Sequence, residues 1–107
     1  MVMSLEGRVI AIAGVAGGLG PVLAGRLAAA GAIVAGADRD AARVAEAGAA
    51  LDLPEGRWDG RAVDLLDEGE TRDWCAALRE RFGAVDGLVH LVGGWRGGQP
   101  LHEEPLA

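Results

Sequence analysis

The 107-residue sequence is poor in cysteine, in basic clusters and in long apolar runs, and each shortage excludes a class of protein. Its one cysteine, Cys75, excludes an intramolecular disulfide and favours a reducing compartment. The net charge is −6 without a cluster of Lys or Arg, which argues against nucleic acid and anionic membranes as partners. Glycines and charges interrupt every apolar run before the roughly 18 residues that a membrane span needs. Residues 1–6 do not resemble a signal peptide, so we expect a cytoplasmic protein.

The most informative stretch of the chain is a run of glycines between two apolar segments. Residues 8–13 are apolar and include β-branched side chains, which is typical of a strand buried on both faces. From Leu19 to Ala30 apolar residues recur at helical spacing, and Pro21 suits the first turn of a helix. The glycines of residues 14–20 therefore predict a tight strand-to-helix turn whose bare N–H groups a phosphate can approach.

The pattern of a buried strand followed by a helix repeats along the chain. It predicts strands at residues 32–37, 61–65 and 85–92, the last one covered on both faces, and helices at 41–51 and 68–82. Asp67 and Glu70 form a capping box at the start of the second of these helices, which buries a stripe of Trp74, Leu78 and Phe82 and ends at Gly83.

This alternation predicts an α/β fold in a single domain spanning residues 1–107. The fold is a Rossmann-like open parallel sheet with the element order β-α-β-α-β-α-β, and it stops after the fourth strand. Residues 93–107 read as a glycine-rich loop and tail. Ligands of such sheets bind at the carboxyl ends of the strands, where the glycine run falls.

Several residues at these strand ends suit a dinucleotide. Gly14, Gly18 and Gly20 have the spacing G-x-x-x-G-x-G, and they would serve the turn, the approach of a pyrophosphate and close helix packing. Asp38 follows the loop by about the 20 residues at which an acid meets the adenosine ribose. Its charge would repel a 2′-phosphate and so favours NAD over NADP, whereas Arg39 would offer that phosphate a bidentate partner. A chance glycine triplet and a solvated turn aspartate are the alternatives.

In these features the chain resembles the short-chain dehydrogenase/reductase family over essentially its whole length. The run Ala13-Gly14-x-x-x-Gly18-x-Gly20 is similar to that family's T-G-x-x-x-G-x-G cofactor loop, and Asp38 matches its ribose-binding acid. Residues 88–93 stand where the family has the end of its fourth strand and its N-N-A-G motif. The resemblance implies a nicotinamide dinucleotide, NAD or alternatively NADP, with contacts from Gly14, Gly18, Leu19, Gly20, Asp38, Arg39, Asp64, Leu65 and Gly93.

The sequence also departs from the family pattern. Ala13 replaces the threonine, and His90, Leu91 and Val92 replace N-N-A. A ring nitrogen of His90 would allow it to take over the bonding role of the first asparagine, but we expect instead a packed, hydrogen-bonded histidine at a strand end. In the family a catalytic serine and a Tyr-x-x-x-Lys pair lie beyond the fourth strand, and this sequence contains neither tyrosine nor lysine.

No catalytic residue is therefore assigned. We expect the cofactor-binding portion of a longer oxidoreductase that transfers a hydride between nicotinamide and a small carbonyl or alcohol substrate. A nucleotide-binding or interaction module without catalysis is the alternative, and a Rossmann-like methyltransferase is a third that the glycine spacing disfavours.

The remaining motifs are weak. His102 lacks the second histidine of a zinc helix, so no metal site is expected, and Cys75 reads as a structural thiol. Trp95 and Arg96 suit either a lid or an ordinary exposed loop. The apolar edge of the fourth strand would be unpaired, which allows self-association into a homo-oligomer.

Overall fold

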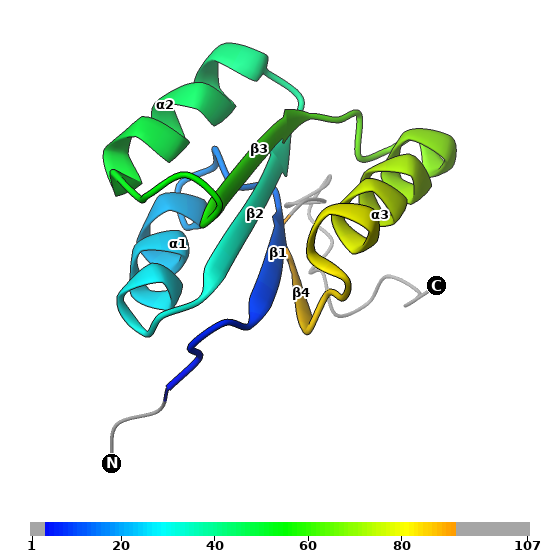
Figure 1. Cartoon of the computed structure of the whole chain (residues 1–107). Coiled ribbons are helices and arrows are strands. Elements are labelled where there is room, and N and C mark those ends of the chain that lie inside the picture. Colours follow the sequence, from blue (N-terminus) through cyan, green and yellow to red (C-terminus); the bar gives the residue numbers. More distant parts are fainter. Residues whose placement is uncertain (1–3, 92–107) are drawn as a thin grey trace, which may run out of the picture.

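The structure is a computed structural model that describes residues 4–91 (Figure 1). Four strands alternate with three helices, as the sequence predicts: β1 (Val9–Ala13), α1 (Gly20–Ala29), β2 (Ile33–Asp38), α2 (Ala41–Leu51), β3 (Trp58–Ala62), α3 (Glu68–Phe82) and β4 (Gly87–His90). Gly31 and Gly83 follow α1 and α3 with φ of 99° and 87°, the left-handed conformation in which helices commonly end. No helix in this part of the chain is long and apolar enough to cross a membrane.

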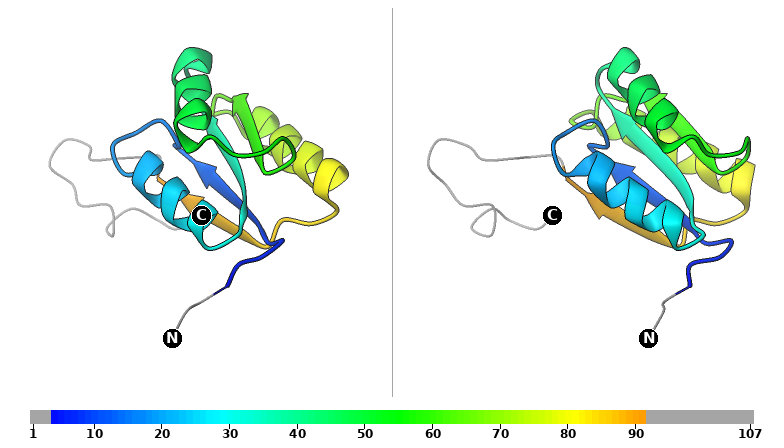
Figure 2. Two further views of the ribbon diagram at one scale, coloured as in Figure 1. Left: turned by 60° about the vertical axis from the view of Figure 1, so that its left-hand side comes forward. Right: turned by 90° about the vertical axis from the view of Figure 1, so that its left-hand side faces the viewer.

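The strands form one parallel sheet in the order β3-β2-β1-β4. Helices α1 and α2 cover one face of the sheet and α3 covers the other (Figures 1 and 2). This is the predicted Rossmann-like α/β sheet. All four carboxyl ends lie at one edge, so the turns that follow β1, β2 and β3 are neighbours in space.

The two faces of the sheet are packed with side chains of different size. On the α3 face, small alanine side chains leave room for the large side chain of Trp74. This cluster consists of Ala11, Ala13, Ala35, Ala37, Val63, Trp74 and Leu78. Branched residues fill the other face, in a cluster of Ile12, Val15, Ala24, Val34 and Val44. The central strands β1 and β2 are thus buried from both sides, as their apolar sequences predict.

The third strand differs from its prediction. It spans Trp58–Ala62 rather than residues 61–65, and its inward-facing residues are a half-buried Trp58 and a buried Asp59. The indole of Trp58 occupies the space that side chains at Gly36, Gly48 and Gly60 would take. Asp59 is buried on the opposite face, where Arg61 and Arg81 neutralise its charge.

The fourth strand also differs from its prediction. It covers Gly87–His90 rather than residues 85–92, and it is an edge strand that pairs with β1. Within residues 4–91 it is not covered on both faces, since Leu88 is 57% exposed and His90 is exposed as well. In this part of the chain the predicted unpaired apolar edge is present.

One of the two hydrogen bonds predicted for the capping box of α3 is present. The Asp67 carboxylate accepts from the Glu70 N–H at 3.0 Å, as predicted. The Glu70 carboxylate, however, accepts from the N–H of Asp64 at 3.0 Å and not from that of Asp67. The Asp67 N–H already donates to the Asp64 carbonyl at 3.0 Å, so Glu70 reaches one turn further back.

Candidate functional site

The glycine run forms the turn between β1 and α1. Gly14 has a φ of 94°, a left-handed conformation that glycine adopts without strain. Its N–H and that of Val15 both donate to the carbonyl of Ala37 at 2.8 and 3.1 Å, which joins the start of the turn to β2. Gly17 then donates to the Gly14 carbonyl at 3.3 Å. The turn is therefore fixed by backbone hydrogen bonds at both of these points.

Gly20 and Gly18 have opposite surroundings. A side chain at Gly20 would collide with the backbone of Val15, so only glycine lets α1 begin this close to the turn. A side chain at Gly18 would meet no atom of residues 4–91 within 4 Å. Among the described residues, no side chain makes a capping hydrogen bond at Leu19, the N-cap residue of α1. No hydrogen bond within residues 4–91 takes up the N–H of Gly18 or Leu19, so these donors are available to an anion.

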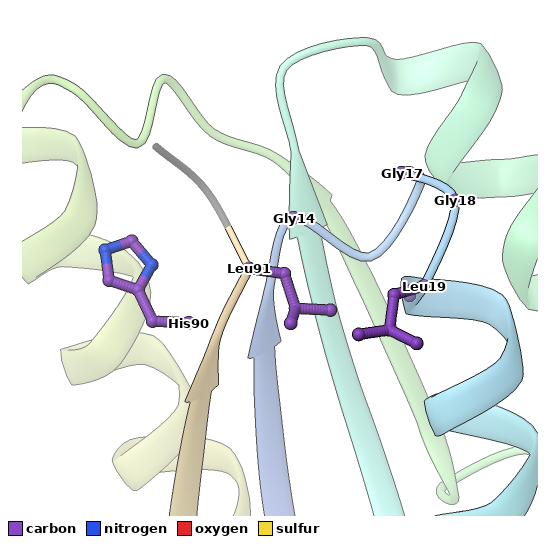
Figure 3. A pocket seen from close by; sticks show the side chains of 7 residues that line it. Gly14, Gly17, Gly18, Leu19, His90 and Leu91 are labelled. Carbon is purple, nitrogen blue, oxygen red and sulfur yellow. The ribbon is translucent and has the colours of Figure 1, made fainter. Parts of the chain in front are cut away.

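A depression of about 280 Å³ lies between the glycine turn and the end of β4, and Gly18 and Leu19 are among the residues that line it. Figure 3 shows Leu19 and Leu91 pointing toward each other across it, while His90 points toward α3. Its lining consists of Gly14, Gly17, Gly18, Leu19, Gly20, His90 and Leu91. Polar backbone on one side and apolar side chains on the other suit a ligand with an anionic part and a flat apolar part.

Asp38 is the last residue of β2 and its carboxylate contacts the turn. One oxygen accepts from the N–H of Ala16 at 3.0 Å and the other from the N–H of Arg39 at 2.8 Å. No salt bridge within residues 4–91 involves Asp38, so each oxygen keeps lone pairs that hydroxyl groups can use. Arg39, the next residue in the chain, is exposed.

Asp64 and Leu65 lie beyond β3, close to Asp38. The Val63 N–H donates to the Asp38 carbonyl at 2.8 Å, which brings the two strand ends together. The Asp64 carboxylate accepts from the N–H of Leu66 at 3.0 Å, and no hydrogen bond within residues 4–91 takes up the N–H of Leu65. Leu65 borders a second hollow of about 580 Å³ between α3 and the end of β4, which His90 also lines.

The structure thus gathers the predicted site residues that it describes at one edge of the sheet, in two groups. Gly14, Gly18, Leu19 and Gly20 line the first depression, while Asp38, Arg39, Asp64 and Leu65 follow β2 and β3. The prediction that His90 is packed and hydrogen-bonded is wrong for this part of the chain, because His90 is exposed and no described residue bonds to its ring.

Gly93, Trp95, Arg96 and His102 lie outside the described residues. Cys75 is a half-buried free thiol within α3 that packs on the core, as expected. Within residues 4–91 no group of three or more His, Cys, Asp or Glu side chains is arranged to hold a metal ion.

Sequence reasoning missed two contributors to the site. Leu91 follows β4, donates its N–H to the Ala13 carbonyl at 2.8 Å and forms the wall opposite Leu19. Arg43, in the first turn of α2, donates to the carbonyl of Ala16 at 3.0 Å. The apolar pattern of the chain signals neither contact. A position at a strand end could have marked Leu91, but nothing in the sequence marks the partner of Arg43.

Comparisons with known proteins agree with this geometry. A sequence model of the family described as short chain dehydrogenase matches residues 8–106. D-threitol dehydrogenase of Mycolicibacterium smegmatis is 32% identical over 89 residues, which are 83% of this chain and 34% of that protein.

Two solved structures from Brucella melitensis are also similar. A short-chain dehydrogenase/reductase described as a glucose/ribitol dehydrogenase has a TM-score of 0.76 at 30% identity, covering 82% of this chain and 37% of that one. A 3-ketoacyl-(acyl-carrier-protein) reductase complexed with NADH has a TM-score of 0.72 at 33% identity, covering 79% of this chain and 34% of that one. The chain spans about a third of the length of these relatives.

Proposed function

The chain belongs to the short-chain dehydrogenase family, and on that premise we propose that it binds a nicotinamide dinucleotide at the carboxyl edge of its sheet. It would supply the cofactor-binding portion of an oxidoreductase. The reaction of the whole protein would be hydride transfer between nicotinamide and a small carbonyl or alcohol substrate.

The observation that carries this proposal is the pair of available N–H groups at the start of α1. Within residues 4–91 no hydrogen bond takes up the N–H groups of Gly18 and Leu19, which stand at the positive end of a ten-residue helix without an acidic residue in its first turn. Backbone donors at a helix N-terminus favour a phosphate group. The pyrophosphate of a dinucleotide fits this position, with Gly14 and Gly20 keeping the turn close to the helix.

The adenosine half of the cofactor suits the ends of β2 and β3. The lone pairs of the Asp38 carboxylate would accept hydrogen bonds from the two ribose hydroxyls. Asp64 and the N–H of Leu65 would contact the adenine, and Gly93 would leave room beside the nicotinamide ribose. The uncompensated charge of Asp38 favours NAD, and Arg39 leaves NADP as the second choice.

When bound, the nicotinamide would donate a hydride to a carbonyl in its reduced form or accept one from an alcohol in its oxidised form. The residues described here bind and orient it: backbone donors hold the phosphates, and Leu19 and Leu91 offer apolar surface next to them. The family reaction also needs a proton donor, and this chain has no tyrosine or lysine to act as one. The second candidate is a nucleotide-binding module without catalysis, which would use this same site.

Calorimetric titration of the chain with NADH, NADPH and S-adenosylmethionine in parallel tests the proposal. We expect saturable binding of NADH, weaker binding of NADPH and no binding of S-adenosylmethionine. Binding of S-adenosylmethionine alone would contradict the proposal and favour a methyltransferase. Absence of binding of all three would contradict both candidate functions.

A matched pair of glycine variants locates the ligand. At Gly18 a side chain has room in the protein but extends toward the proposed pyrophosphate, so Gly18→Val should weaken NADH binding by about tenfold to a hundredfold with little change in melting temperature. Gly25 lies within α1 and also has room for a side chain. Gly25→Ala should keep full affinity, since it changes the same helix away from the turn. Equal affinities of the two variants would contradict the proposed position.

A further inference from the structure

Two side chains outside the glycine turn hold one of its residues from both sides. The N–H of Ala16 donates to the carboxylate of Asp38 at 3.0 Å. The carbonyl of Ala16 accepts from the guanidinium of Arg43 at 3.0 Å. Both side chains come from the end of β2 and the start of α2, so this connection fixes the middle of the turn.

The Arg43 bond determines how the next peptide is oriented. The Ala16 carbonyl and the Gly17 N–H belong to one rigid peptide plane. Arg43 holds the carbonyl end of this plane, and the Gly14 carbonyl accepts from the N–H end at 3.3 Å. The orientation of this plane sets the direction in which the chain enters Gly18 and Leu19, whose N–H groups are the proposed phosphate donors.

Arg43 lies behind the turn rather than in the proposed binding site. It lines a groove between α1 and α2 together with Ala16, Pro21, Glu46, Ala47 and Ala50. The depression in front of the turn has none of these residues in its lining. Arg43 is thus placed to affect a ligand at Gly18 through the backbone of the turn.

The positive charge of Arg43 lies near the N-terminus of α2, where it destabilises the helix. A cation in the first turn of a helix opposes the positive end of the helix dipole. Asp40 stabilises this end as the N-cap, accepting from the N–H groups of Ala42 and Arg43 at 2.9 and 3.2 Å. The cap fixes the backbone of Arg43, and helical side chains point toward the N-terminus, which is the direction of Ala16.

We propose that Arg43 is a positioning residue that preorganises the glycine turn for the pyrophosphate of the cofactor. The inference rests on the proposed function, because it assigns Arg43 to the same site. Without the guanidinium, the plane between Ala16 and Gly17 can rotate, and the donors of Gly18 and Leu19 must be ordered when the ligand binds.

The test compares Arg43→Gln, Arg43→Lys and a control, Arg79→Gln. Arg79 lies on α3, on the opposite face of the sheet, and its replacement removes the same charge far from the turn. Arg43→Gln should weaken binding of ADP, NADH and NADPH alike, by about fivefold, as expected for one exposed hydrogen bond. Arg43→Lys should restore most of the affinity, and Arg79→Gln should leave it unchanged.

Amide hydrogen exchange in the ligand-free chain gives an independent readout. Arg43→Gln should speed exchange at Gly17 by about fivefold without lowering the melting temperature, and Arg79→Gln should not. Unchanged affinity or unchanged exchange in Arg43→Gln would overturn the proposal. A loss confined to NADPH would overturn it too, since Arg43 would then contact the 2′-phosphate directly.

Failure of the wild-type chain to bind NADH or ADP would be a different result. It would overturn the proposed function and with it the binding role of Arg43. The exchange rate at Gly17 would still decide whether Arg43 orders the turn.

Discussion

Asp38 and Asp59 lie on the neighbouring strands β2 and β3, and their carboxylates have opposite surroundings. The side chain of Asp59 is only 3% exposed, and Arg61 and Arg81 approach its two oxygens at 3.1 and 2.7 Å. Asp38 is half-buried and accepts from two backbone N–H groups, without a salt bridge inside the described chain. The charge of Asp59 is compensated by two arginines of the fold. Asp38 has no cationic partner within residues 4–91 and keeps lone pairs for further hydrogen bonds.

The difference separates a stabilising role from a binding role. A buried carboxylate needs cationic partners, because its charge would otherwise lack solvation. Arg61 comes from the same strand as Asp59, but Arg81 comes from α3, so the group also ties that helix to β3. Asp38, at the edge where we propose that the cofactor binds, holds the glycine turn and keeps lone pairs that a ribose hydroxyl can use.

Replacing Asp59 should give the largest effect, and it should be on stability. Asp59→Ala removes two charge-assisted hydrogen bonds and should lower the free energy of unfolding by about 3 kcal/mol. Urea denaturation measures this change, with Asp73→Ala on the exposed side of α3 as the control. NADH affinity of the folded fraction should stay the same. If Asp59→Ala lost less than about 1 kcal/mol, Asp59 would stabilise the fold no more than an exposed ion pair does, which would contradict its proposed stabilising role.

Replacing Asp38 should have the reverse effect. Asp38→Asn keeps the size of the side chain but removes its charge and one acceptor, so NADH affinity should fall by about thirtyfold, or about 2 kcal/mol. NADPH should lose less affinity than NADH, because the repulsion of the 2′-phosphate disappears. Parallel calorimetric titrations with NADH and NADPH measure both effects. If NADH binds the variant as tightly as the wild type, Asp38 has no role in binding.

The smallest effect is expected at Arg39, where a substitution changes the side chain and keeps the backbone hydrogen bond to Asp38. The Arg39 N–H donates to the Asp38 carboxylate whatever the side chain is, whereas the proposed partner of the side chain is the 2′-phosphate of NADP. Arg39→Gln should keep stability within about 0.5 kcal/mol, as is usual for an exposed position. NADH affinity should be unchanged and NADPH affinity should fall by about fivefold. Equal losses for both cofactors would show that Arg39 contacts a group that they share.

The sequence predicts the first half of the fold well. Apolar segments and glycine punctuation locate β1, α1, β2 and α2 within one or two residues, because these elements bury simple hydrophobic faces. The prediction fails at β3, where a buried Asp59 looks like a turn residue until Arg81 of a later helix neutralises it. At β4 the apolar composition suggests a covered strand, but coverage depends on neighbours that a pattern within the strand does not specify.

The site is predictable only where it depends on spacing. The glycine spacing and the position of Asp38 at a strand end follow from local sequence. The bond between Asp38 and Ala16 spans 22 residues, and the bond of Arg43 to Ala16 spans 27. Each ends on a backbone group, which every residue has, so no side-chain pattern reveals it. The assignment of a cofactor to Gly14, Gly18, Leu19, Gly20, Asp38, Arg39, Asp64, Leu65 and Gly93 stays a prediction.

The strand order determines when each strand of the sheet can pair during synthesis. β2 and β3 extend the sheet away from one edge of β1, whereas β4 closes its other edge and comes last of the four strands. A nascent chain on the ribosome can therefore pair β1 with β2 early, but β1 keeps an open edge until residues 87–91 emerge. The hydrogen bond from Leu91 to Ala13, one residue before the glycine turn, completes that edge. The proposed nucleotide site is therefore complete only after Leu91 has emerged and paired with Ala13.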